Sequence, residues 1–211
     1  MSAAVMAGLG EIAEQHWGLF TTAEAGLAGV SRVQLGRLAD RGAISRVIQG
    51  VYRMAGVVDD DRELIRATWL ALGGFTAADS VPPVVAAGTT AADLHGIGDF
   101  IPDAYDFIVP ARKGTRRPGV RFRVRALTRA EVSFVDQIPV LTIERTIADL
   151  VELWTDLSLV ADALRDAVTE GRLVHRAALV AYLAPLAADN GHPRGDGDAL
   201  ARELYEIAGL S

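Results

Sequence analysis

The spacing of apolar residues in the first part of the chain predicts three short helices. Between residues 4 and 16, apolar positions recur at the period of an amphipathic helix. Two further helices are marked by their first residues: Thr21 stands three residues before Glu24, and Ser31 stands three residues before Gln34. Both pairs have the spacing of a capping box, in which the two side chains bond to the free backbone groups of a helix start.

The residues after the third helix predict a pair of strands. Gly42 ends the helix, and in ISRVIQGVYRM, residues 44–54, apolar and polar residues alternate around a turn at Gly50. Two capped helices separated by a turn and followed by two strands are the pattern of a winged helix-turn-helix. We expect this unit to span residues 1–57.

Residues 58–211 mix helical and strand patterns. Asp59 to Asp61 place negative charge where a helix dipole favours it, at a helix start. Small residues predict a helix within the segment 90–98, and Gly96 marks its end. Alternation predicts strands in YDFIVPA (105–111) and VRFRVRAL (120–127), and helical periodicity predicts further helices at 143–154, 157–170, 175–188 and 199–210. The predicted fold class is α+β, with a winged helix-turn-helix domain at 1–57 and a mixed helix and strand domain at 58–211.

Charge is unevenly spread along this chain of net charge −6. Residues 30–54 hold five arginines and a single acid, Asp40, and residues 111–129 hold eight basic residues and no acid. Salt screens electrostatic interactions beyond a Debye length of about 8–10 Å, so the binding of a phosphate group depends more on nearby charges than on the net charge of the chain. The two basic segments are therefore candidate anion-binding surfaces.

The first basic segment coincides with the predicted helix-turn-helix. On its second helix Leu35 and Leu38 are expected to face the core, which leaves a polar stripe on the opposite side. Such a stripe suits a DNA major groove, although it also fits a plain solvated face. We predict that base edges are contacted by Gln34, Arg37 and Arg41, and that phosphates are contacted by Arg32, Arg46 and Arg53.

Three stretches together resemble the AbiEi family of antitoxins from bacterial toxin–antitoxin operons of the abortive-infection type. Residues 18–54 are similar to its N-terminal winged helix and carry the family's Gly-Val-Tyr at 50–52. Residues 86–110 are similar to a small-residue helix and a strand that ends in proline. In IPVLTIERTIADLVE, residues 138–152, the block Pro-Val-x-Thr-x-x-Arg-Thr-x-x-Asp-Leu matches. The resemblance covers most of residues 17–152.

This resemblance implies a function and two partners. The partners would be a nucleotidyltransferase toxin encoded nearby and the operator DNA of the shared operon. It implies that the winged helix represses the operon and that the remainder, 58–211, neutralises the toxin. Two alternatives stay open: an antitoxin that covalently modifies the toxin by phosphorylation, and a stand-alone transcriptional regulator whose larger domain binds a small ligand.

The second basic segment is expected to form a second anion-binding surface. In VRFRVRAL the arginines share one face of the strand. Further DNA, an acidic surface on the toxin and a plain solvated strand face all fit this pattern. The residues of the predicted surface are Arg112, Lys113, Arg116, Arg117, Arg121, Arg123 and Arg125.

We predict no catalytic residues, no metal ligands and no cofactor. The chain has no cysteine, its four histidines are scattered, and the P-loop, HExxH and GxSxG motifs are missing. Arg145 and Asp149 stand four residues apart on a predicted helix, and we interpret them as a structural ion pair rather than a catalytic one. Only a phosphotransferase resembling a protein kinase, the covalent alternative, would need ATP and Mg²⁺.

The start of the chain does not have the pattern of a secretion signal. It has no basic segment ahead of its apolar residues, and the acidic Glu11 follows soon after. The longest stretches without charge, 67–78 and 80–92, are too short to span a bilayer. We therefore expect a cytoplasmic protein that makes no contact with a membrane.

Overall fold

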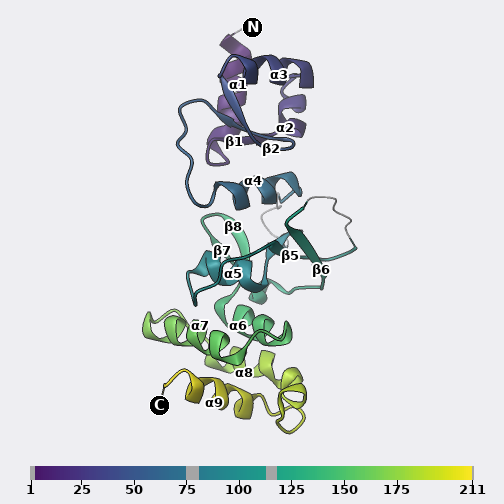
Figure 1. The fold of residues 1–211 in the computed structure, drawn as a ribbon. Coiled ribbons are helices and arrows are strands. Elements are labelled where there is room, and N and C mark those ends of the chain that lie inside the picture. The colour runs from purple at the N-terminus through teal and green to yellow at the C-terminus, as the bar shows by residue number, and fades with distance from the viewer. Residues whose placement is uncertain (1–2, 75–80, 113–117, 211) are drawn as a thin grey trace. The chain divides into compact units, whose positions relative to one another are not determined.

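The computed structural model describes residues 3–74, 81–112 and 118–210. The chain forms two compact units, residues 1–75 and 76–211 (Figure 1). The boundary lies beyond the expected one after Val57, because helix α4 (Glu63–Ala71) packs against the strands of the first unit. The α+β fold class is confirmed. Within the described ranges, every helix is too short or too polar to cross a lipid bilayer.

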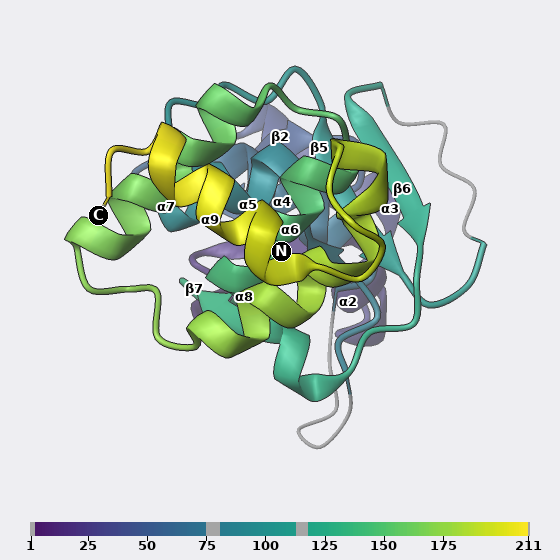
Figure 2. The ribbon, with the colours of Figure 1, turned by 90° about the horizontal axis from the view of Figure 1, so that it is seen from below.

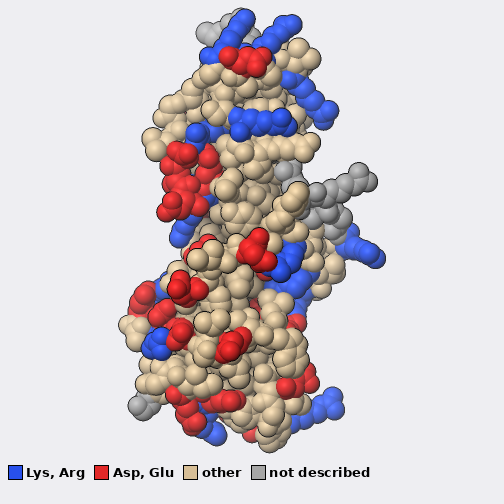
Figure 3. Space-filling model, in the orientation of Figure 1, with Lys and Arg blue, Asp and Glu red and all other residues tan. Residues whose placement is uncertain are grey.

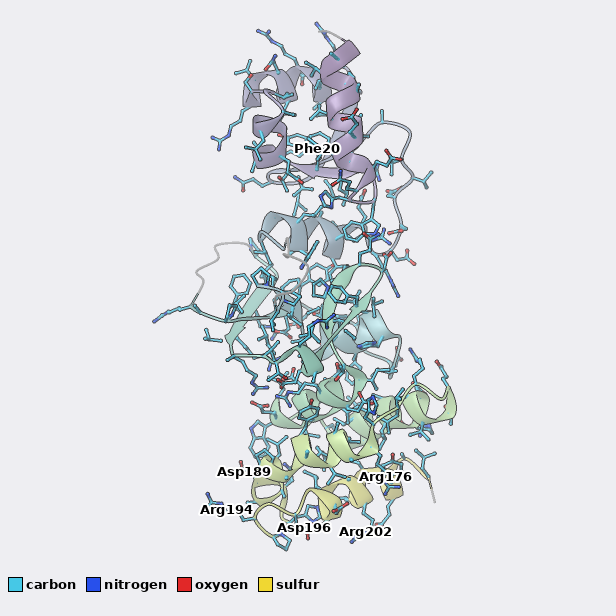
Figure 4. All side chains as sticks on the ribbon, turned by 180° about the vertical axis from the view of Figure 1, so that it is seen from behind. Phe20, Arg176, Asp189, Arg194, Asp196 and Arg202 are labelled. Carbon is cyan, nitrogen blue, oxygen red and sulfur yellow. The ribbon has the colours of Figure 1, made fainter. Side chains whose placement is uncertain are left out.

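The first unit packs its helices around a three-stranded antiparallel sheet of order β1-β3-β2. Its core holds Leu9, Phe20, Leu35 and Ile44, all buried, and the Phe20 ring stacks on Tyr52 with 5.8 Å between centroids (Figure 4). Besides α4, its elements are α1 (Ala3–Glu14), β1 (Leu19–Thr21), α2 (Thr22–Leu27), α3 (Arg32–Asp40), β2 (Ile44–Ile48) and β3 (Val51–Met54).

Both predicted capping boxes are present. The backbone N–H of Thr21 donates to Glu24 over 2.8 Å, and the N–H of Glu24 donates to the Thr21 hydroxyl over 3.2 Å. Ser31 and Gln34 repeat the exchange at 2.8 and 3.3 Å. These bonds satisfy donors that every helix start leaves free, and so fix where α2 and α3 begin.

The second unit is built on a five-stranded mixed sheet of order β6-β5-β4-β8-β7. The pairs β5–β6 and β4–β8 are parallel, and β4–β5 and β7–β8 are antiparallel. The strands are β4 (Val85–Ala86), β5 (Tyr105–Val109), β6 (Val120–Val124), β7 (Val132–Val135) and β8 (Ile138–Leu141). Strands β6 and β7 therefore form the two edges of this sheet.

Among the described residues, five α-helices complete the second unit and enclose its largest core. Helix α6 packs against α5, α7 and α8, and α9 packs against α7 and α8 (Figure 2). The start of helix α9 lies very close to α8. A Cβ at Gly197 would lie only 2.1 Å from the carbonyl oxygen of Val180, so this position requires glycine. The helices are α5 (Gly88–His95), α6 (Ile143–Glu152), α7 (Leu157–Thr169), α8 (Arg176–Leu183) and α9 (Gly197–Ile207).

Two tryptophans follow helix ends with left-handed backbone, a conformation that normally favours glycine. Trp154, just after α6, has φ 58° and is 71% exposed. Trp17, after α1, has φ 55°, but its ring lies edge-on to Trp69 at 6.3 Å and beneath the guanidinium of Arg66. The first unit therefore covers its strained tryptophan, whereas the second unit leaves its own exposed.

Candidate nucleic-acid interface

Helix α3 turns two leucines inward and the rest of its surface outward. Leu35 and Leu38 are buried in the core of the first unit. The exposed positions of the helix are Arg32, Val33, Gly36, Arg37 and Asp40, and Arg41 follows at its C-cap. An open hollow of about 450 Å³ separates the start of α2 from the start of α3, with Arg32 among its lining residues.

Four of the six predicted DNA contacts are exposed cations: Arg32, Arg37, Arg41 and Arg46. Arg46 lies on β2, the first strand of the pair that follows α3. None of the four forms an ion pair with another residue that the structure describes. Figure 3 shows basic side chains over the part of the molecule that contains α1 to α3, with few acidic ones between them. Their charge is available to an anionic partner.

Arg53 does not belong to this set of unpaired cations, which corrects the expectation for it. Its Nη1 donates to Glu63 Oε1 over 2.8 Å and lies 3.5 Å from Asp59 Oδ2, with the arginine side chain only 20% exposed. The two acids come from α4 and the segment before it, at the place where that helix packs on the sheet. We therefore assign Arg53 to the packing of α4.

Gln34 is also occupied within the chain. Its Oε1 accepts hydrogen bonds from the backbone N–H and the hydroxyl of Ser31, both over 2.8 Å. Reading adenine through two bonds needs both the oxygen and the nitrogen of the amide. The structure places Gln34 in the helix cap, and the expected base contact at this residue stays a prediction. The capping box already indicates from the sequence that Gln34 turns back toward Ser31, and α3 also exposes Val33 and Gly36, which the sequence-based prediction did not include.

The first unit has a likeness among known protein families. Residues 9–55 match the family model described as "Transcriptional regulator, AbiEi antitoxin". Residues 9–55 of the first unit are thus similar to an AbiEi antitoxin domain. The match begins within α1 and ends just after β3, so it includes α2, α3 and the strand pair.

Solved structures extend the likeness in fold to the whole chain. The crystal structure of the Rv2827c protein from Mycobacterium tuberculosis aligns with 99% of this chain and with 77% of that chain, with a TM-score of 0.59 and 18% sequence identity. At this identity the alignment shows a common fold. A search of curated proteins returns no match.

The second basic segment, outside the residues that match the AbiEi model, has a different environment from the first. Arg112 is exposed, while Lys113, Arg116 and Arg117 lie outside the described residues. On β6, Arg121 pairs with Asp103 and, over 3.2 Å, with Asp106. The expectation of a free anion-binding face on this strand is corrected, because its arginines are paired with carboxylates of the same chain.

The two remaining arginines of β6 enter a largely buried ion network. Arg123 donates to both carboxylate oxygens of Asp149, which is fully buried, and Arg125 donates to Glu152. Asp149 also accepts the backbone N–H of Gly88, at the start of α5, over 2.9 Å. Buried charges are stable only when they are paired and hydrogen-bonded. The network thus fixes β6 and α5 to α6.

The predicted pair of Arg145 and Asp149 exists, but it is the weaker contact of both residues. Their closest atoms are 3.8 Å apart, whereas Arg145 Nη2 lies 2.9 Å from Glu152 Oε2 and Asp149 binds Arg123 more closely. The guanidinium of Arg145 also lies over the ring of Tyr182, 5.5 Å from its centroid. The Arg-Thr-x-x-Asp-Leu block therefore supplies a packing network.

Charges in this network alter the ionisation of its members. Burial raises the pKa of the Asp106 carboxyl, and the nearby Arg121 and Arg123 only partly offset this effect. Burial would lower the pKa of Arg123, but its hydrogen bonds to Asp149 and the charge of that carboxylate raise it overall. Arg123 therefore remains charged and bound to Asp149.

Proposed function

We propose that this protein is an antitoxin that represses its own operon through α3 and the β2–β3 pair, and that neutralises a nucleotidyltransferase toxin encoded nearby through residues 58–211. The observation that supports DNA binding is the set of four exposed arginines that form no ion pair with a described residue, on a stretch that matches the AbiEi model within an acidic chain. The family description supports the antitoxin role.

The arrangement of the arginines fits a duplex. A recognition helix enters the major groove with its N-terminal residues toward the bases, and arginines beside it bind phosphates. Arg32 stands at the start of α3, where backbone N–H groups also favour a phosphate. Arg41 at the helix end and Arg46 on β2 place two more cations on the same polypeptide segment.

The test of DNA binding is titration of the full chain onto duplex DNA from upstream of its own gene, at several salt concentrations. Changing both Arg37 and Arg41 to Ala should weaken binding and flatten the dependence of log affinity on log salt, because the DNA-facing surface loses two positive charges. The matched control changes Arg194 and Arg202 to Ala, two exposed arginines of the second unit (Figure 4). Equal losses in both double variants would contradict the proposal.

The test of neutralisation mixes the purified protein with the product of the neighbouring gene, with and without Mg-ATP. Native sizing and intact masses should give a stable complex in which neither mass changes. A toxin that gains the mass of one phosphoryl group only with ATP, without a lasting complex, would contradict neutralisation by binding. The Arg37 and Arg41 variant should neutralise normally, because these residues belong to the DNA-binding part of the proposal.

A further inference from the structure

We infer that α3 reads bases through Val33 and Arg37, with Gly36 letting the helix approach the groove closely, and that its preferred site holds a thymine and a guanine about two base pairs apart. This inference rests on the proposed DNA binding. It differs from the sequence-based expectation, in which Gln34, Arg37 and Arg41 formed the reading face.

The rotation of α3 decides which side chains point outward. Successive residues of a helix are about 100° apart, so the direction opposite the mean of Leu35 and Leu38 can be derived from their burial. Val33 lies about 10° from that outward direction and Arg37 about 50°. Gln34 lies about 110° away, beside the core and in contact with Ser31. The outward stripe is therefore centred one position earlier than the polar stripe of the sequence.

Val33 provides an apolar contact where a solvated helix would carry a polar residue. Its side chain is 65% exposed, on the first turn of α3, the part of a recognition helix that meets base edges. In the major groove the apolar feature of the base pairs is the C5 methyl group of thymine. A branched aliphatic side chain and this methyl group can exclude water from each other.

Gly36 lies about 50° from the outward direction, on the side of Val33 opposite to Arg37. A Cβ added there would meet nothing within 4 Å, so packing inside the unit does not require glycine. Glycine within a helix lowers stability relative to alanine. Other helical glycines of the unit, such as Gly26, also have open space. Only Gly36 lies on the outward side of α3, where a missing side chain brings the backbone nearer to the bases.

Arg37 supplies the directional part of the readout. It is exposed, and no described residue pairs with it, so two of its guanidinium nitrogens can donate to the O6 and N7 acceptors of guanine. Val33 and Arg37 are one helical turn apart, which is about 6 Å along the axis. Bases along one strand are about 3.4 Å apart, and this rise corresponds to about two steps.

The experiment uses the full chain and a duplex selected from a randomised library. The wild type should select a site with thymine and guanine at this spacing. Replacing that thymine by deoxyuridine, which lacks only the methyl group, should weaken wild-type binding about fourfold. Val33→Ala should bind both duplexes equally, whereas Gln34→Ala should remain as sensitive to the replacement as the wild type.

Each outcome separates the inference from the function on which it rests. If no duplex binds in a salt-dependent manner, the proposed DNA binding fails. If a site is bound but Val33→Ala keeps the full response to deoxyuridine, or Gln34→Ala changes the selected sequence, the inference fails and DNA binding stands. Gly36→Ala provides a second measurement: it should raise the melting temperature and weaken specific binding. Unchanged binding by that variant would contradict the close approach.

Discussion

The two arginine-rich segments of this chain, 30–54 and 111–129, share a local excess of positive charge and have opposite environments. Around α3 the arginines are exposed and form no ion pairs with described residues, whereas on β6 each of the three arginines binds a carboxylate. The acids that bind Arg123 and Arg125 come from α6, more than twenty residues later in the chain. Charge along a sequence therefore does not indicate charge on a surface, because folding brings distant acids to some arginines and not to others.

The largest expected effect is at Asp149. Changing it to Ala would remove the main partner of Arg123, whose side chain is 25% exposed, and the acceptor of the Gly88 N–H, so the loss should approach the lower end of the range for breaking a buried pair, about 3 kcal/mol. Denaturant unfolding of the second unit should show this loss. Arg37→Ala is the control from the other segment and should change stability by less than about 0.5 kcal/mol. A small effect at Asp149 would mean that the network does not stabilise the fold.

Arg53 should behave like the β6 arginines, although it lies in the first segment. Its pair with Glu63 is mostly covered, so Arg53→Ala should lower the stability of the first unit by about 1 kcal/mol. The salt slope of DNA binding should not change, because Arg53 is already neutralised. If the slope fell as it should for Arg37, the assignment of Arg53 to the packing of α4 would be wrong.

Asp40 is the acid on the outward side of α3, and its removal tests the exposed segment from the opposite direction. Replacing it by Asn removes a negative charge from a face that meets phosphates. Affinity for all duplexes should rise severalfold at low salt, and the gain should shrink as salt increases. An unchanged affinity would place this side of α3 away from DNA.

The smallest expected effects concern pH, and they have opposite signs in the two units. For Glu24, burial raises the pKa, but hydrogen bonds from His16 and Thr21 lower it overall. Its contribution to stability is present above the ordinary pKa of 4.5 and is lost as pH falls through the lowered value. The raised pKa of Asp106 has the reverse consequence: its ionised form destabilises the fold, and acidification relieves that cost.

Hydrogen exchange between pH 6 and pH 3 can separate these two contributions, each smaller than about 1 kcal/mol. Glu24→Gln should remove part of the acid sensitivity of the first unit. Asp106→Asn should remove the opposing contribution in the second unit. If both variants changed the acid sensitivity of stability in the same direction, the assigned direction of the pKa shift of Glu24 or of Asp106 would be wrong.

Local signals predicted the elements well. The starts of α2 and α3 follow from Thr21 and Ser31, because a capping box involves residues only three positions apart. The end of α5 follows from Gly96, which has left-handed backbone at the C-cap. Such features depend on neighbouring residues, and the sequence contains all the information that they need.

The interface and the network were predicted less well, because they depend on distances across the fold. The sequence favoured both a helix cap and a base contact for Gln34, and only the direction of its side chain distinguishes the two. The partners of Arg123 and Arg125 depend on which strand lies beside which helix, and no local pattern in β6 reports this. The division into compact units after residue 75 depends on the packing of α4 on the sheet, which cannot be predicted from the residues of α4 alone.

The positions of the three tryptophans give each unit its own spectroscopic probe. Trp17 and Trp69 lie edge-on to each other within the first unit, and Trp154 is alone and exposed in the second. A soluble quencher should therefore suppress mainly the emission of Trp154, while the coupled pair should dominate the near-ultraviolet circular dichroism. The unmodified chain thus carries two optical signals, by which the melting of its two halves can be followed separately.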